Sequence, residues 1–382
     1  MTESLRSLRR LTSRWVRAVV SSTIPSLMHR FAVAILLLGT SGELRALQTF
    51  APAPPTERHI VDPHWVALWR TRGSATDDLF GVPRHLLAAP DGVIILDEGT
   101  LQLSAFTQRG DRRWTVGRKG SGPGEFSRPI DLTFLPNGDI AVLDPGNGRV
   151  SVFSNIGAYR RSITIPNAAT ALSLCATRDG ALHFINGDAR SFITSHSATG
   201  SVQRTLPFPW PVQPGAPALV HAAAFARGGV AADCAFATTF AFGMGRVRSS
   251  GAIQTSPFVE SLALPTIRRE VMSDHGVRQT VSSGDNASLA SFRSGDTLLV
   301  SFAGRGANKF AILDLYDGAG RYLVSWPLPN ASWVSYREGW LWSIVNPQES
   351  PTLMAFVPAA DTGALFKRWP RPPKVAPSVK RR

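Results

Sequence analysis

The sequence predicts an all-β fold made of repeated four-stranded antiparallel sheets. The clearest copy lies between Gly117 and Gly157 and just beyond, where short apolar runs alternate with turn residues. Those runs are Ile130–Leu135, Ile140–Leu143, Val150–Phe153 and Tyr159–Ile165. Tight turns rich in Pro, Asn and Gly separate them, as expected for strands joined by hairpins. One such sheet cannot bury both of its faces, so the pattern predicts further copies of itself.

The further copies are marked by a glycine turn that follows an apolar run. These turns are Asp91-Gly92, Asn137-Gly138, Asp179-Gly180, Gly228-Gly229, Ser294-Gly295 and Glu338-Gly339. Counted at one glycine per turn, the first three lie 46 and 42 residues apart, which is close to the period of a four-stranded propeller blade. Only the step from Gly228 to Gly295, 67 residues, is long, and it places an insertion around Val259–Asp285. The sequence therefore predicts a six-bladed β-propeller.

The repeats also divide the chain. A propeller cannot be cut without exposing blade faces, so we expect one ring over residues 65–369. The apolar run Trp65–Thr71 precedes the first full repeat, and we expect it to complete the last blade and close the ring. Residues 47–64 form a linker in which Phe50–Pro55 is proline-rich, and residues 370–382 form a basic, proline-rich tail. We expect the protein to be a monomer.

The N-terminal region predicts export. Phe31–Gly39 is a continuous apolar run that follows His29-Arg30, and a small residue, Ala46, marks the expected cleavage point. The run is too short for a comfortable membrane span. Met28 stands directly before this pattern and is a possible true start. We therefore expect residues 1–46 to be an export signal region, with the signal peptide at about 28–46, and the mature protein to be periplasmic or secreted.

The charge of the chain is concentrated at its two ends. The formal net charge is +14, of which residues 1–46 carry +5 and residues 367–382 carry +7, so residues 47–366 carry only +2. A nearly neutral ring lacks the basic face that phosphate binding needs, so we do not expect nucleic acid to be a partner. The basic tail is expected to be solvated, and contact with an acidic envelope surface is the alternative.

Two segments carry a resemblance to a known family. Gly120–Phe126, with the sequence GSGPGEF, and Leu143–Phe153, with the sequence LDPGNGRVSVF, resemble the NHL repeats of six-bladed propellers, and Pro90–Gly110 does so more loosely. In that family the residues matching Asp144 and Arg149 tie strands and turns together. The resemblance therefore implies structural roles for both residues rather than catalytic ones.

The repeat register predicts which side chains line the central channel. Seven residues before each turn glycine stands a polar residue, and the residue after it is apolar in every blade. Because side chains alternate between the faces of a strand, the polar set is expected to point to the axis. Its members are His85, Asp131, Ser173, His221, Ser288 and Ser332. The simplest interpretation of this ring is a water-filled tunnel.

The function that the sequence favours is non-catalytic binding of a protein, peptide or glycan, because GxSxG, P-loop and HExxH motifs are all missing. No cofactor is expected on this interpretation. The alternative is a metal-dependent lyase or hydrolase in which His85, Asp131 and His221 hold zinc or calcium. Propellers related by the resemblance include a zinc-dependent lyase with histidine ligands on its inner strands, whereas here one ligand would be an aspartate.

Two cysteines are present, Cys175 and Cys234. The repeat alignment places Cys175 on an innermost strand and Cys234 on the second strand of the next blade. Export permits a disulfide, but side chains on those two strands need not point toward each other. We therefore expect both cysteines to be free and buried.

Overall fold

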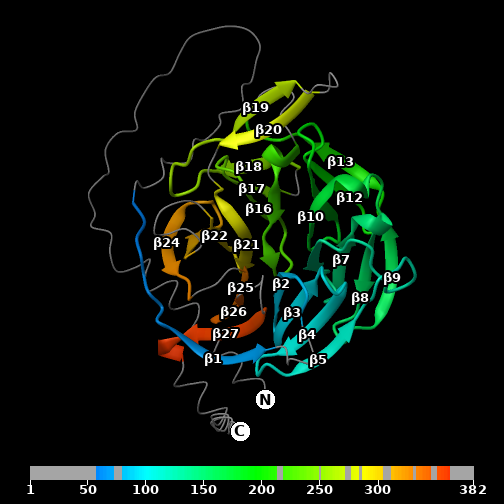
Figure 1. The fold of residues 1–382 in the computed structure, drawn as a ribbon, viewed down its shortest axis with the longest axis vertical. Coiled ribbons are helices and arrows are strands. Elements are labelled where there is room, and N and C mark those ends of the chain that lie inside the picture. The colour runs from blue at the N-terminus through cyan, green and yellow to red at the C-terminus, as the bar shows by residue number, and fades with distance from the viewer. Residues whose placement is uncertain are drawn as a thin grey trace, which may run out of the picture. The chain divides into compact units, whose positions relative to one another are not determined.

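The computed structural model of the chain describes residues 57–72, 80–212, 218–248, 251–271, 277–283, 286–303, 311–329, 333–345 and 351–361. Six antiparallel blades, each with four strands of its own, are arranged around a central axis (Figure 1). The innermost strands of neighbouring blades contact one another around the ring. The predicted six-bladed β-propeller is therefore confirmed. No helix among the described residues is long and apolar enough to cross a membrane.

The first three blades follow the chain from the innermost strand to the outermost one. Blade 1 contains β2 (Pro83–Ala89), β3 (Gly92–Asp97), β4 (Gln102–Thr107) and β5 (Arg112–Val116). Blade 2 contains β6 (Asp131–Phe134), β7 (Ile140–Asp144), β8 (Arg149–Phe153) and β9 (Tyr159–Thr164). Blade 3 contains β10 (Ala171–Ala176), β11 (Leu182–Asn186), β12 (Ile193–His196) and β13 (Val202–Leu206).

The second half of the ring is less regular. Blade 4 contains β14 (Ala223–Phe225), β16 (Cys234–Thr238), β17 (Met244–Val247) and β18 (Ile253–Ser256). Blade 5 contains β21 (Ser288–Ser294), β22 (Thr297–Phe302), β23 (Ile312–Tyr316) and β24 (Tyr322–Pro327). The predicted insertion between these blades is confirmed as a separate hairpin of β19 (Thr266–Val271) and β20 (Val277–Ser283).

The last blade closes the ring with a strand from the start of the chain. Blade 6 contains β25 (Trp333–Arg337), β26 (Trp340–Val345), β27 (Thr352–Pro358) and, outermost, β1 (Trp65–Arg72). β1 pairs antiparallel with β27 from Trp65↔Pro358 to Arg72↔Thr352. The predicted closure by Trp65–Thr71 is therefore confirmed.

The residues just before β1 attach to blade 5. The main chain of His59 and Val61 exchanges two 2.9 Å hydrogen bonds with Ser325 on β24. The buried Arg58 guanidinium donates to Asp314 at 3.0 Å, pairs with Glu260 and lies 4.0 Å from the ring centre of Phe302. Because a desolvated cation needs such partners, this segment is held to blade 5 before β1 joins blade 6.

Apolar packing fills the spaces between blades. The described residues form six buried apolar clusters, and each combines side chains from two neighbouring blades. β3 and β7 are each buried along their whole length, which explains why their sequences are apolar up to the final aspartate. Ring stability therefore rests on the blade seams as well as on the sheets.

Side chains of the outermost strands also lock the seams. Within a blade, the connections between strands 1 and 2 and between strands 3 and 4 lie on one side of the ring, which we call the turn face. The remaining connections lie on the opposite side, the loop face. Blade 6 has no strand 3–4 connection, because its fourth strand is β1. Trp69 on β1 donates to the carbonyl of Gln108 at 2.6 Å, and Trp114 on β5 donates to that of Asn155 at 3.1 Å. Both acceptors lie in the strand 3–4 turn of the next blade.

We predict that Gly157→Ala destabilises the fold more than Gly138→Ala, by about 1–2 kcal/mol. Both glycines have φ of +83°, so the backbone strain of alanine is shared. A Cβ on Gly157 would lie 2.8 Å from the indole of Trp114, whereas one on Gly138 would meet nothing within 4 Å. Urea unfolding of the two variants measures the difference, and equal midpoints would contradict the seam contact.

Candidate functional site

The innermost strand of blade 4 leaves its sheet and crosses the axis. After Phe225 the chain turns, and β15 (Arg227–Gly228) pairs in parallel with β21 of blade 5. β15 also contacts β2, β6 and β25 of blades 1, 2 and 6. Ala231 then pairs with Thr177 of blade 3, and its carbonyl accepts the Arg178 N–H at 2.7 Å. This crossing segment, residues 226–231, therefore contacts the inner strands of blades 1, 2, 5 and 6 and the residues that directly follow the inner strand of blade 3.

Glycine is required at the point of closest approach. A Cβ on Gly228 would lie 2.3 Å from the carbonyl oxygen of Arg293 on β21. The Gly228-Gly229 pair, interpreted from the sequence as a hairpin turn, is thus part of the crossing segment. That interpretation is wrong because blade 4 joins its first two strands by a longer connection, from Phe225 to Cys234.

The Arg227 side chain joins two of the predicted channel residues. Its Nε donates to Asp131 Oδ1 at 2.8 Å and its Nη2 to His85 Nδ1 at 2.7 Å. His85 Nε2 lies 2.7 Å from Glu98 Oε1. Asp131 Oδ2 accepts from Ser173 Oγ at 2.5 Å and from the Leu174 N–H at 2.9 Å. We call these five side chains, from blades 1 to 4, the hub.

Charge pairing determines the protonation of the hub. Burial by itself raises the pKa of Asp131, but the Arg227 charge together with the Ser173 and Leu174 hydrogen bonds holds that pKa below its usual value. Burial, assisted by Arg227, lowers the pKa of His85 against the opposing effect of Glu98. Since a guanidinium only donates, His85 Nδ1 must accept, which leaves the proton of the neutral ring on Nε2 facing Glu98.

This network leaves the hub without a nucleophile and base pair. Ser173 Oγ donates to Asp131 and accepts the Phe225 N–H at 3.0 Å, and the accepting nitrogen of His85 is occupied by Arg227. A serine nucleophile would need a histidine nitrogen as its acceptor instead. The arrangement is typical of a structural ion-pair network, in which opposite charges neutralise one another at the axis.

Two other predicted channel residues, His221 and Ser288, make contacts outside the hub. His221 ends the 3₁₀ turn η3 (Ala218–His221), and its ring packs on Phe208 with centroids 5.0 Å apart. His221 was predicted on the inner strand because it lies seven residues before Gly228. Since Gly228 belongs to the crossing segment and not to a hairpin turn, this spacing does not give the inner strand of blade 4. Ser288 Oγ donates to the Thr238 carbonyl at 2.9 Å. Ser332 lies outside the described residues.

Two of the three residues predicted to hold a metal contact a protein cation. The Arg227 guanidinium stands between His85 and Asp131, whereas the third residue, His221, lies in η3 against Phe208. Within the described part of the chain, no group of three or more His, Cys, Asp or Glu side chains is placed to hold a metal ion. The role of Arg227 was not predicted from the sequence. Its only signal there is that a charged residue interrupts an apolar inner-strand segment directly before two glycines.

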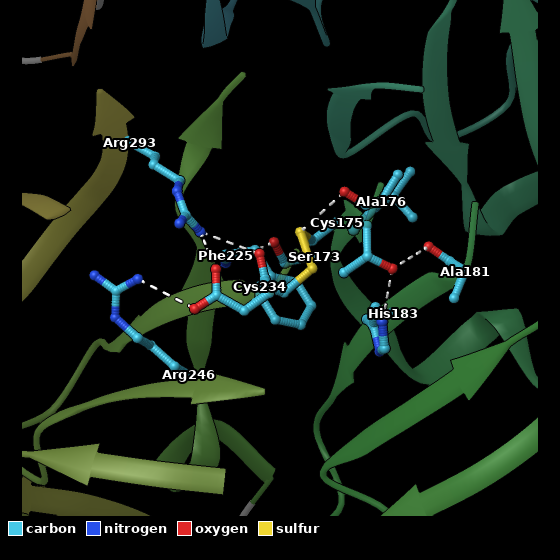
Figure 2. The surroundings of a disulfide bond; sticks show 12 residues. Ser173, Cys175, Ala176, Ala181, His183, Phe225, Cys234, Arg246 and Arg293 are labelled. Carbon is cyan, nitrogen blue, oxygen red and sulfur yellow. Dashed lines mark hydrogen bonds and ion pairs between the residues drawn. A yellow bond between two sulfur atoms is a disulfide. The ribbon is translucent and has the colours of Figure 1, made fainter. Parts of the chain in front are cut away.

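The cysteine prediction is wrong, because Cys175 and Cys234 form a disulfide (Figure 2). The predicted strands are right, since Cys175 lies on β10 and Cys234 on β16, with Cα atoms 6.1 Å apart. Their side chains meet in the seam between blades 3 and 4. Next to Cys234, Asp233 accepts from Arg246 at 3.2 Å and pairs with Arg293 of blade 5. The exit of the crossing segment is thus anchored on both sides.

The roles implied for Asp144 and Arg149 are confirmed. Asp144 accepts the N–H groups of Ser127 and Arg128 at 3.1 and 2.8 Å. Arg149 donates to the carbonyls of Gly122 and Glu125 at 2.7 and 2.9 Å. Both side chains fold the glycine-rich connection between blades 1 and 2 onto the sheet, so their function is structural.

A group of aromatic side chains marks the loop face of blades 3 and 4. Phe208 and Trp210 come from the connection after β13, and Phe242 comes from the turn between β16 and β17. The Phe208 ring lies 5.2 Å from that of Trp210 and 5.1 Å from that of Phe242. Phe208 is buried, whereas Trp210 and Phe242 are half-buried. This aromatic patch offers flat apolar surface to a ligand.

We predict that stability falls between pH 7.5 and pH 5 because of His183 on β11. Burial lowers the pKa of His183 to about 4, with Nδ1 2.8 Å from Ser195 Oγ. The unfolded chain, with a pKa near 6.5, then binds the proton first, so this contribution is complete above pH 6.5 and declines as pH falls toward 4. Down to pH 5 the loss is about 2 kcal/mol.

Urea unfolding at the two pH values measures this loss. The His183→Asn variant keeps a hydrogen-bonding group on the side of Ser195 and should show a smaller decline, whereas His64→Asn, at an exposed position, should behave as the parent. An unchanged decline in His183→Asn would contradict the assignment.

Comparisons with known proteins agree with this fold. A family model described as a 6-bladed β-propeller matches residues 75–198, which contain most of blades 1 to 3. A Bacteroides fragilis protein named as an exported protein superposes with a TM-score of 0.54 at 14% identity, covering 79% of this chain and 97% of that chain. No curated protein matches the sequence significantly.

Enzymes are among the other similar structures. Virginiamycin B lyase from Staphylococcus aureus has a TM-score of 0.46 and 11% identity, covering 76% of this chain and 99% of its own. Hydrazine synthase of Kuenenia stuttgartiensis has a TM-score of 0.45 and 11% identity, with coverage of 76% and 99%. At such identities a shared fold carries no shared activity.

Proposed function

We propose that the protein is an exported, non-catalytic binding propeller that holds a protein, peptide or glycan on its loop face. The observation that carries this proposal is the pairing within the hub. Arg227, Asp131, His85 and Glu98 satisfy one another, so neither His85 nor the two carboxylates of this network stand as an unpaired base. The aromatic patch at Trp210 and Phe242 gives the loop face a surface suited to sugar rings or peptide side chains.

Export is supported by the cysteines and by the N-terminal pattern. Disulfides form and persist in oxidising compartments and are rare in the cytoplasm, and both cysteines of the chain are used in one.

The GSGPGEF and LDPGNGRVSVF segments further support kinship with the NHL-repeat propellers. The basic tail, residues 370–382, provides positive charge for contact with an acidic envelope surface.

Export is tested by expressing the full chain in a bacterium and sequencing the N-terminus of the product outside the cytoplasm. We expect it to begin near Leu47, with Cys175 and Cys234 resistant to thiol alkylation. Recovery of the intact chain with two alkylated cysteines in the cytoplasm would overturn this part of the proposal.

Binding is tested in the same cells with a photo-crosslinking amino acid at Trp210 and, as a control, at Ile156, which is exposed on the turn face of blade 2. Adducts from position 210 alone are expected. Metal analysis of the purified protein tests the enzyme alternative. Stoichiometric zinc or calcium that disappears in the His85→Ala, His221→Ala double variant would replace the binding proposal with a metal-dependent enzyme.

A further inference from the structure

Exposed arginines gather on the outer edge of blades 1 to 4, near the turn face. They come from the strand 3–4 turns and the outermost strands, residues 107–116, 153–164, 196–206 and 247–256. We call this set the basic rim: Arg109, Arg112, Arg113, Arg160, Arg161, Arg204 and Arg248. The same four segments contain one acidic residue, Asp111, and Arg113 also pairs with Asp91 in the strand 1–2 turn of blade 1. Charge is thus segregated within a ring whose net charge is only +2.

The rim continues across the seams between blades. Arg161 of blade 2 donates to the Ala198 carbonyl of blade 3 at 3.4 Å. Arg204 of blade 3 lies over Gly251 of blade 4, where a Cβ would come within 1.4 Å of its Nη1. The guanidinium groups of Arg161 and Arg204 therefore sit against the next blade. The strands that contain five of the rim arginines, β5, β9 and β13, follow one another around the outside of the ring (Figure 1).

Protection of the open strand edges accounts for part of this pattern. Charged side chains on edge strands discourage pairing with another chain. That purpose is served by charges of either sign, however, and mixed signs would keep the surface neutral. Five arginines and no acidic residue on β5, β9 and β13 therefore indicate an additional role, for which an anionic partner is the complementary choice.

The shape of the surface selects the kind of partner. Successive blades turn around the axis, so a flat bilayer would meet the outer edge at only one or two of them. An extended, flexible chain can follow the rim over all four. Carboxylates are matched to arginine because the planar guanidinium donates two parallel hydrogen bonds.

We propose that the basic rim binds an anionic polysaccharide whose uronate carboxylates pair with arginines on successive blades. This site is separate from the loop-face patch of the proposed function and depends on that function only for export, which would bring the protein to such polymers. Since the rim charges are exposed, the binding is weak per contact and sensitive to salt.

The test uses fluorescent polygalacturonate and residues 47–382 of the protein. We expect binding at low salt that weakens as sodium chloride rises. The triple variant Arg112→Gln, Arg160→Gln, Arg161→Gln should bind about tenfold more weakly. The control triple variant Arg70→Gln, Arg118→Gln, Arg321→Gln removes the same charge from exposed positions elsewhere and should change binding by less than about twofold.

Every variant keeps the basic tail, so a difference between the two sets belongs to the rim. Equal weakening in both sets, or no binding by the parent at low salt, would overturn the proposal. Tighter binding to phosphatidylglycerol vesicles than to the polymer, lost in the rim set, would replace the polysaccharide with a lipid surface. Crosslinking from Trp210 is unaffected by these outcomes, so the two proposals fail separately.

Discussion

Replacing Arg227 by methionine is expected to destabilise the protein by about 3–5 kcal/mol. The change keeps most of the apolar stem but leaves the carboxylate of Asp131, 1% exposed, without its cation. The pKa of Asp131 should then rise above its unfolded value. A carboxyl with a raised pKa binds its proton first in the folded state, so this destabilisation should shrink as pH falls toward 4, and urea unfolding at several pH values measures it.

Two further variants make the result interpretable. Arg178→Met removes an exposed arginine next to the crossing segment and should change stability by less than about 0.5 kcal/mol. Arg227→Met combined with Asp131→Asn removes both charges and should recover part of the loss, because no buried charge is left unpaired. If Arg227→Met unfolds at the midpoint of the parent, the hub does not hold the blades together.

Most of the ring could be predicted because it follows from local patterns. Gly138 and Gly180 have φ of +83° and +88°, values that favour glycine, and they sit in the strand 1–2 turns where the period placed them. The alternation of polar and apolar residues put Asp131 and Ser173 in one network, since each blade keeps the same register there. Repetition thus carries the information for blades 1 to 3.

The crossing segment could not be predicted, because its position depends on contacts between blades. Gly228 follows an apolar run as the turn glycines do, but its small size serves the approach to Arg293 instead. Because Gly228 is not the turn glycine of blade 4, the position predicted for His221 from it is wrong, and His221 lies in η3. Arg227 acquires its role only when blades 1 and 2 bring His85 and Asp131 to the axis.

The disulfide was missed for a related reason. Strand assignment places Cys175 and Cys234 on adjacent blades, but whether two side chains meet depends on the distance and twist between the blades. Sequence spacing contains neither quantity. A Cα separation of 6.1 Å, within the range of disulfides, becomes visible only in the assembled ring.

Removal of the disulfide by the double variant Cys175→Ala, Cys234→Ala is expected to lower the free energy of unfolding by about 4 kcal/mol. The bond closes a loop with a sequence separation of 59 residues, so its loss enlarges the ensemble of the unfolded chain. It also frees the exit of the crossing segment from blade 3. Urea unfolding under oxidising conditions measures the difference, and with dithiothreitol present throughout the parent should unfold at the midpoint of the variant. A variant that matches the oxidised parent would mean that the hub and the seams alone hold blades 3 and 4 together.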